Sequence, residues 1–417
     1  MTPIEFAAAT LFAIALVHTF AARQFERLAH RFPRHEGLFH LLGEVEVVFG
    51  FWALVLVLVM AALSSWKEAV SYVEGRQYTE PLFVFVIMVI AASHPVLETL
   101  RWSVDRLAGL LPVARELATA WICLAVLPLL GSLVTEPAAM TLAALLLAPR
   151  VFCPGVPEWL KYLALGVLFV NVSIGGTLTS YAAPPVLMVA SAWNWDSAFM
   201  AAQFGWKAAL AVLLNATVVS WLLRRHLRAP PAPAGGSDTP RVPGPVRVAH
   251  LLFLVAVVAT AHHPAVFFGL FLFFLGFTTA YGRYPQPLLI KEALLFAFFL
   301  AGLVVLGGMQ EWWLQPLVSG MGPRTRFFGA LGLTAITDNA ALTYLGSLIE
   351  GLPDASKYAL VAGAVAGGGL TVIANAPNPA GVALLRGGFA DGTIGAGGLL
   401  LGAAGPTTVA ALAFLLL

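Results

Sequence analysis

Charged residues are scarce in this 417-residue chain. Asp, Glu, Lys and Arg together make up 11% of it, hydrophobic residues make up 59%, and the mean hydropathy is +0.87. An ordinary globular chain has about a quarter charged residues, because charged side chains cover the surface that faces water. This scarcity excludes a soluble protein of several domains and predicts an all-α protein that crosses a membrane many times.

Cysteine is nearly absent, since Cys123 and Cys153 are the only two. Two cysteines exclude a disulfide framework and a cysteine-based metal site. The net charge of +2 shows no strong bias toward one sign, so we expect no nucleic-acid partner. No phosphate-binding loop, HExxH or GxSxG motif is present. We therefore expect a protein that is not an enzyme, that has no nucleotide or other cofactor, and that contacts membrane lipid.

Long apolar runs dominate what is present. A membrane-spanning helix needs about 20 apolar residues, and about ten segments of the chain meet this measure. They are residues 5–21, 38–63, 81–98, 158–193, 197–223, 248–262, 264–281, 288–309, 356–388 and 392–416. Two more apolar stretches, 107–149 and 317–350, have a polar, helix-breaking interruption in the middle. We interpret these two as re-entrant hairpins.

Basic residues predict the orientation of the spans. Arginines are concentrated in residues 23–36 and 224–247, and basic connections remain in the cytoplasm. Successive spans cross the membrane in alternating directions. This alternation keeps most basic residues in the cytoplasm only if each hairpin enters and leaves the membrane on the same side. This topology puts both termini outside.

The chain divides into two halves that resemble each other. Residues 1–37 form a first span and loop, 38–223 the first half, 224–247 a flexible linker rich in Pro, Gly and Ser, and 248–417 an extra span and the second half. The motif TEPAAMT at 135–141 is matched by TDNAALT at 337–343, and GGTLTSYAAPP at 175–185 by GGGLTVIANAP at 367–377. In the predicted topology the two halves are inverted repeats, as transporters often contain.

The breaks within apolar runs predict a transport site. Irregular backbone at membrane depth is tolerated where protein or a wet cavity surrounds it, and broken helix ends leave carbonyls and amides free to bind ions. Threonine hydroxyls and asparagine amides at these breaks supply oxygen, which hard cations prefer. The alternative is that threonines bond back to helical carbonyls. The candidates beside the two tip acids are Thr135, Thr141, Thr337, Asn339, Thr343, Thr179, Thr371, Asn375 and Asn378.

Asp338 and Glu136 are the main candidates, because each lies at a hairpin tip. An Asp at a helix centre in the membrane costs about 2.5–3.5 kcal/mol, and loss of water favours the protonated form, so a proton and a cation can compete for it. Glu136 has the matching place in the first motif. The alternative for Asp338 is a helix cap, with Asn339 forming the turn.

The motifs resemble those of the ion transporter superfamily, which includes divalent-anion/sodium symporters, arsenite efflux proteins and NhaD-type antiporters. More narrowly, GEVEVVFGFW at 43–52 and ITDNAALTYLGS at 336–347 resemble a bacterial family of sodium/proton antiporters. The resemblance implies a homodimer in the bacterial inner membrane, with a scaffold domain and a mobile transport domain that moves as an elevator. It also suggests a proton-relay or gating role for Glu46 and Glu44, for which an interfacial pair facing water is the alternative.

Three functions remain open. We expect exchange of sodium, or another monovalent cation, for protons, with no resident metal beyond the transported ion. A sodium-coupled or efflux carrier of an organic or inorganic anion would fit the same fold, although two tip acids would repel an anion. A membrane-embedded enzyme would require Glu44, Glu46 and His94 to converge, whereas the sequence places them at separate span ends.

Overall fold

The computed structural model describes residues 2–227, 242–282, 288–390 and 392–417, and in this part of the chain all regular structure is helical. The first half contains α1 (Pro3–Arg31), α2 (Glu36–Gly43), α3 (Val45–Leu63), α4 (Trp66–Glu74), α5 (Thr79–Ala91), α6 (His94–Leu110), α7 (Arg115–Leu124), α8 (Val126–Leu130), α9 (Glu136–Leu147), α10 (Glu158–Gly175), α11 (Pro184–Trp193), α12 (Ser197–Met200) and α13 (Trp206–Leu223). The second half contains α14 (Gly244–Ala259), α15 (Pro264–Ala280), α16 (Ile290–Gly307), α17 (Glu311–Ser319), α18 (Pro323–Thr334), α19 (Asn339–Ser347), α20 (Asp354–Gly367), α21 (Asn378–Leu385) and α22 (Ala396–Leu416).

The described helices agree with a helical membrane protein. Four of them, α10 with its 3₁₀ extension, α12–α13, α16 and α22, are long and apolar enough to cross a membrane. The bent pairs α2–α3 and α5–α6 would each add one span. Large apolar side chains such as Leu58, Phe273 and Leu401 point outward, as expected where lipid rather than water surrounds a helix.

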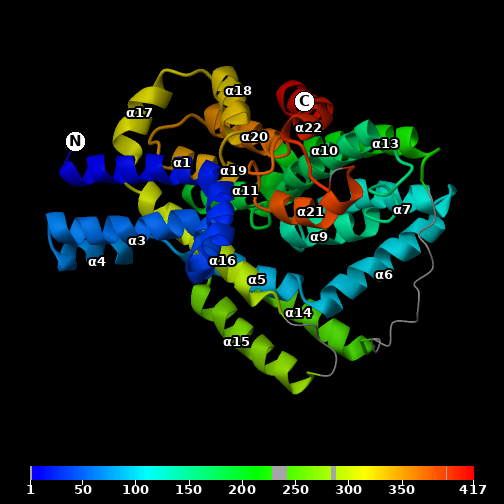
Figure 1. Cartoon of the computed structure of the whole chain (residues 1–417), viewed down its shortest axis with the longest axis horizontal. Helices are drawn as coiled ribbons and strands as arrows, with labels where there is room; N and C mark the ends of the chain where they lie inside the picture. The colour runs from blue at the N-terminus through cyan, green and yellow to red at the C-terminus, as the bar shows by residue number, and fades with distance from the viewer. Residues whose placement is uncertain (1, 228–241, 283–287, 391) are drawn as a thin grey trace.

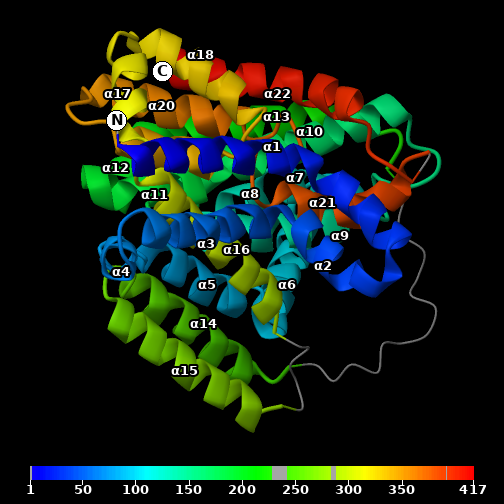
Figure 2. The same ribbon diagram turned by 60° about the vertical axis from the view of Figure 1, so that its left-hand side comes forward.

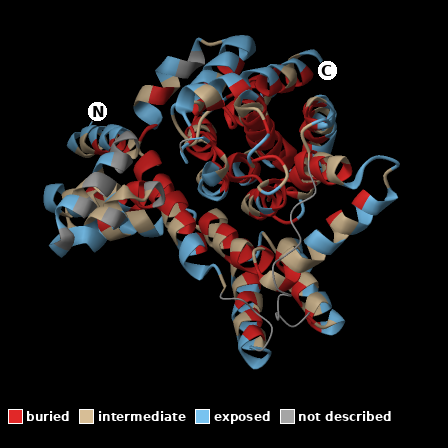
Figure 3. Cartoon of the chain, turned by 45° about the vertical axis from the view of Figure 1, so that its right-hand side comes forward, coloured by how far each residue is buried: buried red, intermediate tan, exposed pale blue. Residues whose placement is uncertain are grey.

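The helices form two hydrophobic clusters, which we call the hairpin body and the flanking helices. The hairpin body comprises α7–α13, α18 and α20–α22, and the flanking helices comprise α1, α3–α5, α14–α17 and α19 (Figures 1 and 2). Burial is densest inside the hairpin body (Figure 3), where every residue of α10 from Ala164 to Gly175 is buried. The α6, α9 and α11 helices contribute to both clusters.

The interrupted segments expected from the sequence are present as breaks between helices. The stretch 107–149 contains α7, α8 and α9, with a non-helical tip before Glu136, and 317–350 contains α18 and α19 with a tip before Asn339. The α10 and α20 helices end at the glycine pairs, and their exit helices are α11 and α21. The packing is crossed, since α9 contacts α21 and α19 contacts α11.

The expected span 81–98 is bent. The α5 helix ends at Ala91, and α6 starts at His94 at an angle of 63°. Pro95 occupies the first turn of α6, where its missing N–H costs nothing. Because Ser93 has an extended backbone, His94-Pro95 begins a helix rather than ending the span.

Candidate cation site

The tip of the first hairpin is held against the first broken helix. Thr135 caps α9, its Oγ1 accepting from the Ala138 N–H at 3.3 Å. The Ser132 hydroxyl donates to the Gly175 carbonyl at 2.7 Å, and Thr179 Oγ1 donates to the Ser132 carbonyl at 2.7 Å. These bonds satisfy backbone groups that the broken helices leave open.

Glu136, the first residue of α9, is completely buried. Its Oε2 accepts a hydrogen bond from Asn375 Nδ2 at 2.8 Å, across 239 residues of sequence. Glu136 Oε1 and Asn375 Oδ1 are both buried and find no hydrogen-bond partner in the described part of the chain. Gly176 lies directly against Oε1, where a Cβ would collide with it. The first hairpin and the second break thus each contribute one buried, unsatisfied oxygen beside the Glu136–Asn375 hydrogen bond.

The second hairpin tip is built in a similar way. Asp338 caps α19, its Oδ1 accepting from the N–H groups of Ala340 at 2.8 Å and Ala341 at 3.1 Å. Thr371 Oγ1 donates to the Ala335 carbonyl at 2.8 Å. Asn339, the first residue of α19, is completely buried, and its Nδ2 lies 3.4 Å from Ser173 Oγ.

Glu136 and Asp338 do not occupy corresponding positions, which corrects the expectation from the motifs. Asp338 is a helix cap like Thr135, whereas Glu136 is a first helical residue like Asn339. The contacts agree, because Glu136 faces Gly176 and Asn339 faces Gly368, the second glycine of each break. Counted from the helix caps, the two tips align with a shift of one residue from the motif match, since the cap geometry, and not the acidic side chain, fixes where each helix starts.

Two cavities adjoin these tips. The first, which we call the site cavity, has a volume of about 50 Å³ and is lined by Asp338, Asn375, Phe296, Phe299, Ile373, Ala376 and Pro379. The second, the vestibule, has a volume of about 410 Å³, and its lining includes Thr135, Thr141, Glu44, Lys291, Phe296, Ala376 and Pro379. Asp338 lines the site cavity together with Asn375, the hydrogen-bond partner of Glu136.

Several predicted ligands have hydroxyl or amide hydrogens committed to backbone carbonyls. Thr337 donates to Leu333 at 2.8 Å, and Thr343 donates to Asn339 at 3.1 Å within α19. Asn378 Nδ2 donates to Gly368 at 2.8 Å and bridges the second break. Its Oδ1, like that of Asn339, is buried without a described partner. The structure therefore groups Glu136, Asn375 and Asp338 and leaves the Thr337 and Thr343 hydroxyls bonded to backbone carbonyls four residues earlier.

Glu44 lies at the vestibule and not at the hairpin tips. It occupies the N-cap position of α3 without a side-chain cap hydrogen bond, and its Oε1 pairs with Lys291 Nζ at 3.4 Å. The Glu46 side chain lies outside the described residues, as does most of the 224–247 linker. Among the residues described, no three His, Cys, Asp or Glu side chains gather in a way that could hold a metal ion.

The sequence alone did not indicate the residues that position or enclose the site. Ser132 and Ser173 bind the two breaks, and Phe296, Phe299 and Lys291 come from α16 of the flanking helices. A serine directly after a glycine in the apolar run before residue 135 was the available signal for Ser132. Nothing in the local pattern of α16 separates Phe296 from its other phenylalanines.

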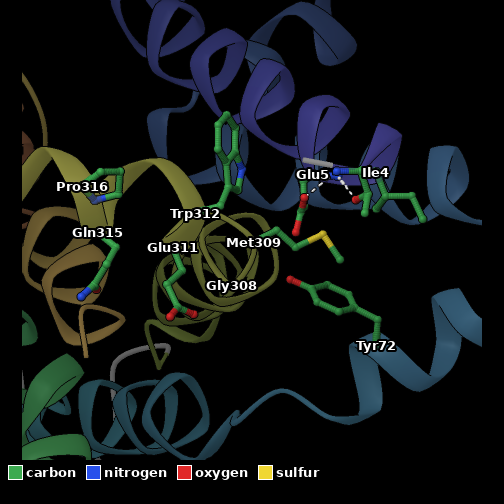
Figure 4. A pocket seen from close by; sticks show the side chains of 10 residues that line it. Ile4, Glu5, Tyr72, Gly308, Met309, Glu311, Trp312, Gln315 and Pro316 are labelled. Atoms are coloured by element: carbon green, nitrogen blue, oxygen red, sulfur yellow. Dashed lines mark hydrogen bonds between the residues drawn. The ribbon is translucent and has the colours of Figure 1, made fainter. Parts of the chain in front are cut away.

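A larger pocket of about 670 Å³ lies elsewhere, between α1, α4 and α17 (Figure 4). Its lining includes Glu5, Tyr72, Glu311 and Trp312, and none of the predicted site residues. In Figure 4 the Glu5 side chain turns back toward the start of α1, where Oε2 accepts from the Thr2 N–H at 2.6 Å. This acid therefore serves the helix terminus.

We expect Gly176→Ala to lower ion transport about tenfold or more. The new methyl group would occupy the space of Glu136 Oε1, and overpacking of this kind costs about 1–3 kcal/mol. The measurement is cation-driven proton movement in membrane vesicles, normalised to protein abundance. Gly405→Ala is the control, because a Cβ there meets no atom within 4 Å. Equal activity of the two variants would contradict the close approach of Gly176 to the carboxylate.

Comparison with known proteins shows the family to which the chain belongs. A model of the family described as "Putative Na+/H+ antiporter" matches residues 3–417. No curated protein matches the chain. The match spans almost the whole chain, including both hairpins and both breaks, and the family is one of transporters rather than enzymes. This protein therefore belongs to the family described as "Putative Na+/H+ antiporter".

Proposed function

We propose that the protein exchanges sodium, or another monovalent cation, for protons. Glu136 carries the proposal: it is a fully buried carboxylate with one oxygen bound by Asn375 and the other without a described partner. A buried carboxylate is tolerated only when it is neutralised, by a proton or by a cation. Because both loads need the same group, binding one releases the other.

The proposed cation ligands are oxygens around Glu136. Glu136 Oε1 and Asn375 Oδ1 are available on the two sides of the contact, and Asp338 lines the adjoining site cavity. Asn339 Oδ1 and Asn378 Oδ1 are further buried oxygens near the breaks. We propose Thr135, Thr141, Thr179 and Thr371 as secondary candidates, whose oxygens retain lone pairs after their hydrogens are donated.

The size and charge of the site favour a cation over an organic anion. The site cavity of about 50 Å³ has room for a small ion with a few waters, given that one water needs roughly 10–15 Å³ measured in this way. Two carboxylates nearby would repel an anion. No observation favours an anion carrier, and the experiment below would detect one.

We propose that the two halves are inverted repeats with re-entrant hairpins. The paired contacts of Thr179 with Ser132 and of Thr371 with Ala335 support the repeat. The α9 and α18 helices have 12 residues each, about 18 Å at 1.5 Å per residue, against a hydrocarbon core of about 30 Å. Such short arms support hairpins that enter and leave on one side.

We propose an elevator movement in which the hairpin body slides along the flanking helices. The division of the apolar side chains into two clusters supports two bodies, with the α19 arm of the second hairpin packed in the cluster of the flanking helices. The resemblance described above supports a homodimer in a bacterial inner membrane, and the arginines at 23–36 and 224–247 support a topology with both termini outside. Glu44 at the vestibule supports a gating role better than a place in the site.

The proposal is tested in everted vesicles that carry an imposed pH gradient. Addition of sodium or lithium is expected to dissipate the gradient in vesicles containing the protein and not in vesicles lacking it. Failure of sodium, lithium and potassium to produce any response would overturn the proposal. Dissipation that requires a particular anion would identify an anion carrier instead.

A further inference from the structure

Phe296 of α16 belongs to the walls of two cavities. It lines the vestibule and also the site cavity that touches Asp338 and Asn375. The other shared wall residues, Ala376 and Pro379, come from the second break and the start of α21. A ring on the flanking helices and a small, irregular segment of the hairpin body therefore separate the vestibule from the carboxylate site.

The ring of Phe296 is packed and not free in the vestibule. Phe296 is 5% exposed. Its ring stacks on that of Phe299 with a centroid distance of 5.9 Å and an interplanar angle of 18°. Phe299 in turn meets Phe49 of α3 edge-on at 5.3 Å. This aromatic row holds the Phe296 ring in one orientation.

The helix that carries Phe296 is fixed against its neighbour. Gly302 of α16 and Gly50 of α3 approach so closely that a Cβ on either residue would collide with the other helix. Close-packed backbones of this kind do not slide without losing their contacts. The passage between the cavities can therefore open through rotation of the Phe296 ring or through movement of Ala376 and Pro379, and not through a shift of α16 alone.

We propose that Phe296 is the access barrier of the ion site, an apolar constriction between the vestibule and the site cavity. This inference rests on the proposed function, because it assigns the route by which the exchanged ion reaches Glu136 and Asp338. An apolar ring excludes water and hydrated ions from a narrow passage. While it is closed, the carboxylates do not exchange freely with vestibule water, which prevents an uncoupled proton leak.

The test is the reactivity of introduced thiols toward a membrane-impermeant maleimide, in a Cys153→Ser background because Cys153 is the partly exposed native cysteine. Ala383→Cys reports on the vestibule, and Ile373→Cys reports on the site cavity. We expect rapid labelling of the Ala383→Cys thiol and slow labelling of the Ile373→Cys thiol from the vestibule side. Adding Phe296→Ala should accelerate labelling of the Ile373→Cys thiol about tenfold or more, equivalent to about 1.4 kcal/mol of lost barrier.

Phe273→Ala is the matched control. It removes the same ring from an exposed position of α15 that lines neither cavity, so labelling at 373 should stay slow. Equal acceleration by both substitutions, no acceleration by Phe296→Ala, or rapid labelling at 373 without it would each overturn the barrier. Thiol labelling does not require ion exchange. If the labelling follows the expected pattern but the protein shows no antiport, the proposed function is refuted and the Phe296 barrier is retained.

Discussion

Replacing Glu136 with glutamine is expected to reduce sodium-dependent proton movement by at least about a hundredfold. Glutamine keeps an oxygen for Asn375 Nδ2 but has neither the negative charge nor the exchangeable proton. A unit charge acting at about 4 Å in an effective dielectric of 20 contributes roughly 4 kcal/mol, which is about three powers of ten in binding. The measurement is the rate at which sodium dissipates an imposed pH gradient in everted vesicles.

The fold should survive Glu136→Gln, because the side chain keeps its volume and its contact with Asn375. The abundance and thermal unfolding midpoint of the purified protein should therefore match those of the wild type. Glu68→Gln makes the same chemical change at an exposed position of α4 and should leave transport unchanged. Transport by Glu136→Gln at the wild-type rate would remove Glu136 from the exchange site.

Asp338 has two roles that two substitutions can separate. Asp338→Asn removes the charge but retains a side chain that caps helices as well as Asp does. We expect it to raise the half-saturating sodium concentration about tenfold, the factor that corresponds to roughly 1.4 kcal/mol, because the carboxylate lines the site cavity. Its thermal stability should change little, since Ala340 and Ala341 keep an acceptor for their N–H groups.

Asp338→Ala should show the sodium defect together with a loss of about 1 kcal/mol of stability, the usual effect of removing a cap. Sodium titrations and thermal unfolding of both variants give the comparison. If Asp338→Asn transports like the wild type while Asp338→Ala is only less stable, Asp338 is a cap and Glu136 acts without it.

The class of protein and the places where helices break could be predicted from the sequence. Glycine pairs in apolar runs end α10 at Gly175 and α20 at Gly367, and the polar interruptions at residues 135 and 338 lie at the hairpin tips. These predictions succeed because they depend on local chemistry. Glycine and proline disfavour continuation of a helix wherever they occur, and apolar composition is independent of the neighbours in space.

The partners of the site residues could not be predicted in the same way. Matching the two tip motifs by residue type paired Glu136 with Asp338, whereas the caps and the facing glycines pair Glu136 with Asn339. The hydroxyls of Thr337 and Thr343 could have pointed toward an ion, but they bond to carbonyls one turn back. A helix offers that local bond at nearly every position, so residue type alone does not decide between the two roles.

The amino-acid sequence by itself determined that this is a helical membrane protein with two interrupted hairpins and two broken helices, since span length, apolar content and helix breaking are properties of short segments. Only the tertiary structure decided that the carboxylate of Glu136 meets the amide of Asn375, 239 residues away, and that Phe296 lines the cavity beside Asp338. Those contacts depend on crossed packing between the halves, in which α9 lies on α21 and α16 faces both. Side chains that converge from distant segments acquire their partners only when the whole core has packed.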